Sequence, residues 1–145
     1  MSKLRQSDVN KLANVHPDLV AVVEKAREYY SFAVVEGLRT VERQRELVAK
    51  GASQTMASRH LTGHAVDLAP WLDADKDGVA DNGEIRWDWP MFFPLADAMK
   101  KAAAELGVQI VWGGAWKNLN DLPVPITSKN MSKSFPDGPH FELDR

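Results

Sequence analysis

The apolar and polar positions of the chain follow helical spacing in three places. The first helical pattern opens at residues 16–18, the second covers residues 40–50 with Thr40 as its cap, and the third opens at Pro94 and stops at Gly107. The apolar stripe of the first helix is Leu19, Val22, Val23, Ala26 and Tyr30, and that of the third is Leu95, Met99, Ala102 and Leu106.

Short apolar segments between these helices predict strands at residues 32–35, 64–68, 108–112 and 141–143. The segment 113–136 is long and irregular, and a loop of that length in a compact domain is more often functional than idle. Because short strands alternate with helices, the sequence predicts an α+β fold in which helices pack on a small, mainly antiparallel sheet.

Composition places the chain among ordinary globular proteins. It has 145 residues, 44% of them hydrophobic and 26% charged, so we expect one domain over residues 1–145. No apolar run approaches the ~20 residues of a membrane helix, and the start lacks the apolar stretch of an export signal. The net charge of -2 argues against nucleic-acid binding. We therefore expect a monomer without stable membrane association.

The chain contains no cysteine, which excludes disulfides, thiol nucleophiles and thiolate metal sites. A transition-metal site must therefore use histidine and carboxylate ligands. The histidines are His16, His60, His64 and His140.

Two imidazoles and one carboxylate make a three-ligand zinc site with an open fourth position, and His60, Asp67 and His140 can supply that set. The metal would polarise a bound water and lower its pKa toward ~7. Asp137 precedes His140 by three residues, across Gly138-Pro139, so a turn can aim its carboxylate at this water as a general base.

His64 is the rival ligand, because it lies four residues after His60 and would share a helical face with it. Gly63 and the β-branched Val66 disfavour a helix there, and the residue after His60 is Leu61 and not the glutamate of a zincin helix. We therefore expect His64 to support the ligands or to face the substrate.

The central segment resembles the S-x-H-x-x-G-x-A-x-D motif of the M15 family of zinc peptidases. Ser58, His60, Gly63, Ala65 and Asp67 occupy its fixed positions. This family comprises D-Ala-D-Ala carboxypeptidases, dipeptidases and phage L-alanyl-D-glutamate endopeptidases.

Three further elements carry the resemblance over most of the chain. The tail Asp137–His140 is similar to the family's [DE]-x-x-H element. The segment 37–40, followed by Gln44, is similar to its G-x-R-T element. The segment 112–114 resembles the family's segment before the last loop. By size and layout the chain is most similar to single-domain phage endolysins.

The resemblance implies Zn²⁺ held by His60, Asp67 and His140, with Asp137 as the catalytic base. It also implies that Arg39 stabilises the oxyanion, since a fixed guanidinium supplies donors where charge develops. A structural ion pair is an equally good explanation of Arg39 from chemistry alone. The remaining candidates are Ser58, as support for a ligand or as a loop cap, and Trp112 and Trp116, as walls of the substrate groove or as core residues.

Residues 73–84 fit the calcium-loop pattern D-x-D-x-D-G-x5-E in full. Five acids and Lys76 give this loop -4, which leaves +2 for the rest of the chain, and such crowding favours a bound cation over a solvated acidic turn. Because a strand end precedes these residues, and not the helix of an EF-hand, we expect an inserted EF-hand-like loop. The expected Ca²⁺ ligands are Asp73, Asp75, Asp77, the carbonyl of Val79, Asp81 and Glu84.

The resemblance implies a peptidoglycan peptidase that cuts the L-Ala–D-Glu bond of the stem peptide and lyses the bacterial host. Calcium would be either a switch or a structural ion. The alternatives are a D-Ala-D-Ala carboxypeptidase or dipeptidase, and a non-catalytic calcium-dependent cell-wall-binding module. Because an exported carboxypeptidase would show a signal, we expect synthesis in the host cytoplasm and action on the wall after release.

Overall fold

The computed structural model describes residues 4–52, 58–72 and 84–144. Its helices are α1 (Gln6–Lys11), α2 (Pro17–Ala26), α3 (Val41–Ala49) and α4 (Trp89–Leu106). Short 3-10 turns form η1 (Arg59–Thr62), η2 (Leu119–Asp121) and η3 (Ser128–Asn130). The strands are β1 (Phe32–Glu36), β2 (Ala65–Pro70), β3 (Ile110–Trp112), β4 (Lys117–Asn118) and β5 (His140–Leu143).

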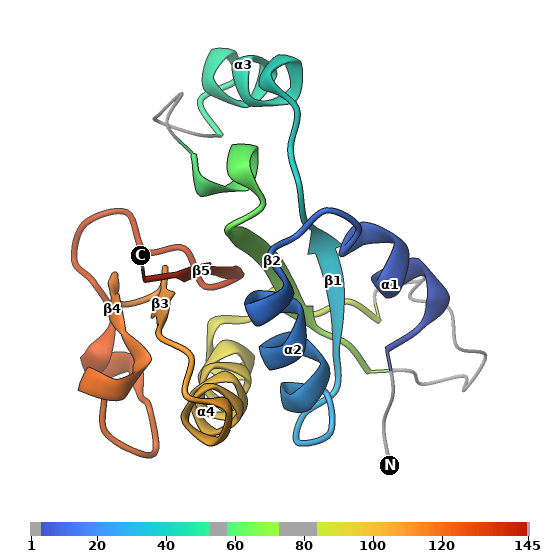
Figure 1. The fold of residues 1–145 in the computed structure, drawn as a ribbon. Coiled ribbons are helices and arrows are strands. Elements are labelled where there is room, and N and C mark those ends of the chain that lie inside the picture. The colour runs from blue at the N-terminus through green and yellow to red at the C-terminus, as the bar shows by residue number, and fades with distance from the viewer. Residues whose placement is uncertain (1–3, 53–57, 73–83, 145) are drawn as a thin grey trace.

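The strands form one sheet in the order β1-β2-β5-β3-β4, and every neighbouring pair is antiparallel. Figure 1 shows β5 between β2 and β3, although it follows all the other strands in the sequence. This confirms the predicted α+β class with a small antiparallel sheet.

One face of the sheet packs on the helices. Figure 1 shows α2 and α4 next to each other below the sheet, and these two helices contact one another. Val66 and Leu68 of β2 and Phe141 of β5 are fully buried in this core. Because side chains alternate along a strand, Asp67 and His140 point to the opposite face.

The register of β2 and β5 brings these two polar residues together. Asp67 lies directly opposite His140, and Val66 lies directly opposite Phe141. Their side chains therefore meet across the two strands, on the face away from the helices.

The first two predicted helices are confirmed, but the start of α4 differs. Thr40 caps α3 by accepting a hydrogen bond from Arg43 N at 3.1 Å. Helix α4 begins at Trp89, so the start predicted at Pro94 is wrong. Pro90 fits the first turn, whereas Pro94 lies inside the helix and cannot donate a hydrogen bond to the Pro90 carbonyl. Burial of Phe92 stabilises this extra turn.

The predicted calcium ligands Asp73, Asp75, Asp77, Val79 and Asp81 lie outside the described residues. The two residues that flank this segment are hydrogen-bonded to each other, since Leu72 N donates to Glu84 O at 2.9 Å. The side chain of Glu84 is buried. None of the described helices combines the length and the apolarity that a membrane crossing needs.

Candidate metal centre

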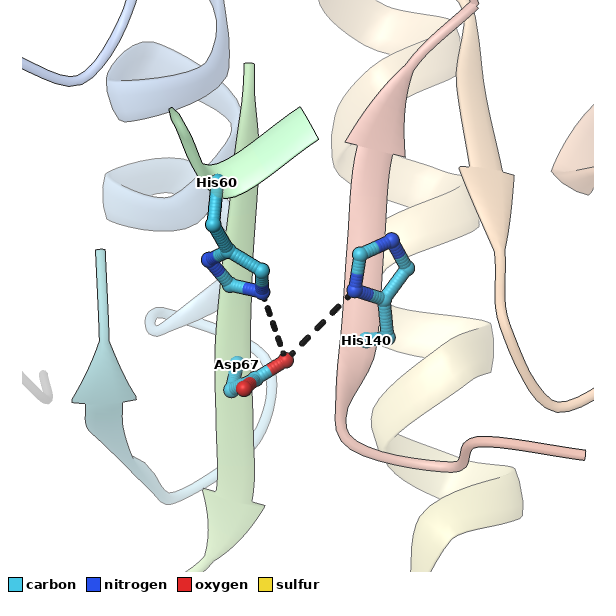
Figure 2. Close-up of side chains that lie close together, drawn as sticks. All are labelled: His60, Asp67 and His140. Carbon is cyan, nitrogen blue, oxygen red and sulfur yellow. Dashed lines mark hydrogen bonds and ion pairs between the residues drawn. The ribbon is translucent and has the colours of Figure 1, made fainter. Parts of the chain in front are cut away.

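Three side chains from different elements converge on the polar face of the sheet. His60 comes from η1, Asp67 from β2 and His140 from β5, and Figure 2 shows the two imidazoles pointing at one carboxylate oxygen. Asp67 Oδ1 lies 3.2 Å from His60 Nε2 and 3.6 Å from His140 Nδ1. Each residue offers a ligand atom within 4.8 Å of the others. The predicted ligand set is therefore brought together.

Neighbouring acceptors fix which nitrogen of each histidine faces the centre. His60 Nδ1 donates to the carbonyl of Gly37 at 2.8 Å, and His140 Nε2 donates to Glu142 Oε1 at 2.7 Å. The other nitrogen of each ring is thereby directed at Asp67. Outer hydrogen bonds of this kind orient histidines that bind metals.

Local geometry explains how η1 presents His60. Ser58 Oγ accepts a hydrogen bond from His60 N at 3.2 Å and so caps this turn. Gly63 ends the turn in the left-handed region, with φ 76°, and a Cβ there would lie 2.5 Å from Asn14 O. Only glycine meets both demands without strain. Ser58 therefore acts as the loop cap considered from the sequence, and it also lines the cleft.

The donor set fits zinc. Zn²⁺ takes two histidine nitrogens and one carboxylate oxygen at about 2.0–2.2 Å, and a tetrahedron of that size separates neighbouring ligand atoms by roughly 3.3 Å. The distances of 3.2 and 3.6 Å from Asp67 Oδ1 match this spacing. Three protein ligands leave one position open, as in catalytic zinc sites.

The protonation of His140 and the ionisation of Asp67 favour one another. Burial raises the pKa of the Asp67 carboxyl, but hydrogen bonds from His140 and His60 outweigh it and hold that pKa well below its usual range. Burial lowers the pKa of His140, whereas its bonds to Asp67 and Glu142 raise it to about 9. A proton or a metal ion therefore belongs between His140 and Asp67.

Asp137 lines the same cleft but stands outside the group of three ligands. Its backbone N donates to Gly113 O at 2.9 Å, and His140 N donates to Asp137 O at 3.2 Å, so the turn before β5 fixes its place. Burial raises the pKa of the Asp137 carboxyl, and the nearby Asp67 raises it further. The carboxylate is therefore a stronger base than that of an exposed aspartate.

The two tryptophans proposed as groove walls differ in their positions. Trp112 is fully buried and its Nε1 donates to Gly138 O at 2.8 Å, so it supports the turn that carries Asp137 but does not line the cleft. A large apolar ring on the inner face of β3 is stabilised by packing in the core. Trp116 lines the cleft, 42% exposed, with its ring centroid 5.4 Å from that of His140.

Arg39 forms several polar contacts at the edge of the cleft. Its guanidinium donates two bonds to Glu36, at 2.9 Å each, one to Gln44 at 2.8 Å and one to Asp67 Oδ2 at 3.4 Å. A β-bulge between Val34 and Glu36 places Glu36 opposite Asp67, which brings this carboxylate to Arg39. In this geometry Arg39 is a member of an ion-pair network.

His64 lies apart from the ligand group. Its Nδ1 is 2.6 Å from Thr62 Oγ1, and its ring is 5.5 Å from that of His16. It is not among the residues that line the cleft around the ligands. The geometry therefore gives no support to either expected role of His64, as a support for the ligands or as a substrate contact.

Sequence reasoning missed several residues that line the cleft, among them Arg59, Glu142, Glu36 and Phe135. Glu142 could have been found, because a residue two places after His140 on a strand shares its face. Glu36 depends on a bulge that has no sequence signal. Phe135 lines the cleft at 69% exposure, and its carbonyl accepts a bond from Trp116 Nε1 at 2.8 Å.

The cleft has a volume of about 850 Å³ and holds the ligand group, Asp137 and Arg39 at its lining. Trp116 and Phe135 are exposed aromatic residues that line the cleft, and Trp116 lies beside His140. We call these two residues the aromatic wall. Both residues have left-handed backbone conformations, with φ 51° and 47°. Such conformations are uncommon for residues other than glycine and cluster at functional sites.

Comparison with known proteins gives one consistent result. A family model described as phage L-alanyl-D-glutamate peptidase matches residues 1–144. The L-alanyl-D-glutamate peptidase of Escherichia phage T5 is 31% identical over 147 aligned residues, which cover 97% of each chain. That of Listeria phage A118 is 33% identical over 81% of this chain, which spans 38% of the Listeria phage protein.

A solved structure agrees in fold. The crystal structure of the Serratia marcescens L-Ala D-Glu endopeptidase ChiX superposes with a TM-score of 0.75 at 38% identity. The match covers 97% of this chain and 89% of that one.

Proposed function

Because this chain belongs to the phage L-alanyl-D-glutamate peptidase family, we propose that it is a zinc-dependent endolysin that hydrolyses the L-Ala–D-Glu bond of peptidoglycan stem peptides. The observation that carries this proposal is the convergence of His60, Asp67 and His140 on one point of a cleft that also holds Asp137. A non-catalytic wall-binding module would have no use for such a set.

The three ligands would hold zinc through His60 Nε2, His140 Nδ1 and Asp67. A zinc ion there supplies Lewis-acid chemistry, which polarises a carbonyl and makes water a stronger acid. The hydrogen bonds from His60 to Gly37 and from His140 to Glu142 keep the two rings in position without reorganisation during the reaction.

Asp137 is the group that moves the proton. Its carboxylate accepts a proton from the attacking water and returns it to the amine that leaves. A carboxyl whose pKa is raised by burial and by Asp67 suits both steps better than an exposed one.

Arg39 and the aromatic wall complete the site. Arg39 would stabilise the developing oxyanion, and the donor that would be redirected to it is Nη2, whose 3.4 Å contact to Asp67 is the longest of its contacts. Trp116 and Phe135 would hold apolar parts of the substrate next to His140.

We also propose that the acidic loop binds Ca²⁺ and thereby regulates the enzyme. The full EF-hand pattern of residues 73–84 supports the proposal, and so does the hydrogen bond between Leu72 and Glu84 that joins its two flanks. The loop follows the strand that carries Asp67, so an ion could order that strand or the cleft. In low cytosolic calcium the enzyme would then be inactive, and it would become active at the cell wall.

A calcium titration at saturating zinc tests the regulatory role. Hydrolysis of purified peptidoglycan should rise with added calcium and fall after selective calcium chelation. Activity that does not change with calcium would leave the ion a structural role at most. A thermal shift caused by calcium, and lost in Asp75→Asn, would identify the loop as its site.

We further propose the setting in which the enzyme acts. The enzyme would act as a monomer, be made in the cytoplasm of an infected bacterium, and reach the wall after release. Its partner there is the peptidoglycan stem peptide.

The reaction itself is tested by mass spectrometry of digested muropeptides. Cleavage between L-Ala and D-Glu is expected, with loss of activity after chelation and recovery with zinc. Release of only the terminal D-Ala would point to a carboxypeptidase. Intact muropeptides in the presence of zinc and calcium would contradict the proposed function.

A further inference from the structure

The cleft is lined by two arginines that differ in their contacts. Arg39 already contacts Glu36, Gln44 and Asp67. To the described residues Arg59 makes one hydrogen bond, from Nη2 to the carbonyl of Leu143, at the long distance of 3.5 Å. Its Nε is buried and has no hydrogen-bond partner.

A buried donor without an acceptor is rare in folded proteins and calls for an explanation. Within the part of the chain that the structure describes, no carboxylate forms an ion pair with Arg59, whereas Arg39 is paired with two. The cleft is also lined by four acidic residues, Glu36, Asp67, Asp137 and Glu142, and by the imidazoles of His60 and His140, which face Asp67. Among the arginines in the described part of the cleft, Arg59 is thus the one without a carboxylate partner that could bind an anionic ligand.

The position of Arg59 relative to the metal centre fits a dipeptide. Its guanidinium lies against Leu143, at one end of β5, while His140 lies at the other end. Three residues of a strand span about 10 Å. Trp116 stands beside His140, so Arg59 and Trp116 mark two separate regions of the cleft, one near each end of β5.

The substrate of the proposed function contains a matching anion. Glutamate has two carboxyl groups and only one of them can continue the stem peptide, so the other is free. This free carboxylate lies on the residue whose amine leaves when the bond is cut. A guanidinium offers a carboxylate two parallel charge-assisted hydrogen bonds.

We propose that Arg59 binds the free carboxylate of the D-glutamate residue and thereby determines specificity for this residue after the scissile bond. This inference rests on the proposed function. It gives the substrate a direction in the cleft, with the glutamate toward Arg59 and the alanine toward the aromatic wall.

The test compares two synthetic peptides that contain the L-Ala–D-Glu bond, one with the free carboxylate and one with that group converted to an amide. The wild-type enzyme should cleave the acid with a kcat/KM roughly 10- to 100-fold above that of the amide. Arg59→Gln should lose this advantage by slowing cleavage of the acid and leaving that of the amide within about twofold. Arg59→Lys should recover part of it, because it keeps the charge and loses the paired geometry.

Arg43→Gln is the matched control. It removes the same charge from α3, where Arg43 pairs with Glu46 at 3.5 Å outside the lining of the cleft, and both peptides should be cleaved as by the wild type. Zinc content and thermal midpoint verify that each variant is folded.

The outcomes separate the two proposals. If Arg59→Gln slows the cleavage of both peptides equally, or if the wild type cleaves acid and amide equally well, Arg59 does not recognise the carboxylate. The inference is then wrong. If the zinc-loaded wild type cleaves neither peptide nor peptidoglycan, the proposed function fails and the inference fails with it.

Discussion

Glu142 lies two residues after His140 on β5, and its Oε1 accepts a hydrogen bond of 2.7 Å from the His140 Nε2. This bond leaves Nδ1 as the nitrogen that faces Asp67. The carboxylate therefore determines the orientation of a ligand that it supports from outside the ligand group.

Replacement of Glu142 should weaken zinc binding without removing a ligand. We expect Glu142→Ala to lower zinc affinity by about 10- to 100-fold, because the His140 ring loses the acceptor that orients it. Glu142→Gln keeps a hydrogen-bond acceptor and should lose less zinc affinity than Glu142→Ala. Competition with a chromogenic chelator measures both, and equal affinity in Glu142→Ala and the wild type would refute the supporting role.

Substitutions of Asp137 and of His140 should distinguish a loss of catalysis from a loss of metal binding. Asp137→Ala should retain zinc and lose hydrolysis, since the ligand group does not include this carboxylate. His140→Ala should lose zinc, because one of three ligands is gone. Metal analysis of the purified variants, together with a peptidoglycan assay, checks both statements. Full hydrolysis by Asp137→Ala would show that another group is the base.

Zinc affinity should depend on pH through His140. In the metal-free fold the pKa of His140 is raised from 6.5 to about 9, so at neutral pH zinc must displace a proton from this ring. Affinity should rise about tenfold per pH unit between 7 and 9. Calorimetry in buffers of different ionisation enthalpy should detect the release of about one proton at pH 7, and no release would contradict this protonation state.

The raised pKa of His140 also affects the stability of the metal-free protein. This stability should fall as pH rises, whereas zinc affinity should increase. A raised pKa contributes stability that is fully present below the unfolded value of 6.5 and is lost as pH rises through about 9. Denaturant unfolding in the presence of a chelator should therefore show a declining free energy of unfolding across this window. His140→Gln should flatten the decline.

Gly113 should tolerate no side chain. A Cβ there would lie 2.5 Å from Asp137 O and 2.9 Å from the Cβ of His140, so Gly113→Ala must displace the turn that carries both residues. Because a displacement of about 1 Å can cost roughly 100-fold in rate, we expect a loss of that order in kcat/KM.

Gly107→Asn is the control for this substitution. Gly107 has a positive φ, 69°, a side chain there meets nothing within 4 Å, and asparagine adopts this conformation readily. Its activity should equal that of the wild type. Equal activity of Gly113→Ala and the wild type would show that the turn can move without loss.

Sequence reasoning found the candidate ligands because they lie in local motifs whose chemistry is specific. His60 and Asp67 are seven residues apart in one segment, and His140 has a carboxylate three residues before it. What no local pattern contains is the pairing of β2 with β5, which places Asp67 opposite His140. That pairing is a long-range property of the core.

The errors have equally physical causes. Pro94 has the features of a helix start, yet the burial of Phe92 extends α4 to Trp89. For Trp112 the sequence left a groove wall and a core residue open, and strand alternation turns its ring into the core. Glu36 reaches Arg39 through a bulge, which depends on how two strands meet and not on either strand alone.

The central place of β5 also affects the order of events during synthesis. The ribosome makes β1 to β4 first, yet the position between β2 and β3 stays empty until residues 140–143 emerge from the exit tunnel. A nascent chain therefore holds His60 and Asp67 without their third partner. The hydrolytic centre is completed only by late insertion of this strand, so a stalled or prematurely terminated polypeptide would be inert toward the cell that makes it.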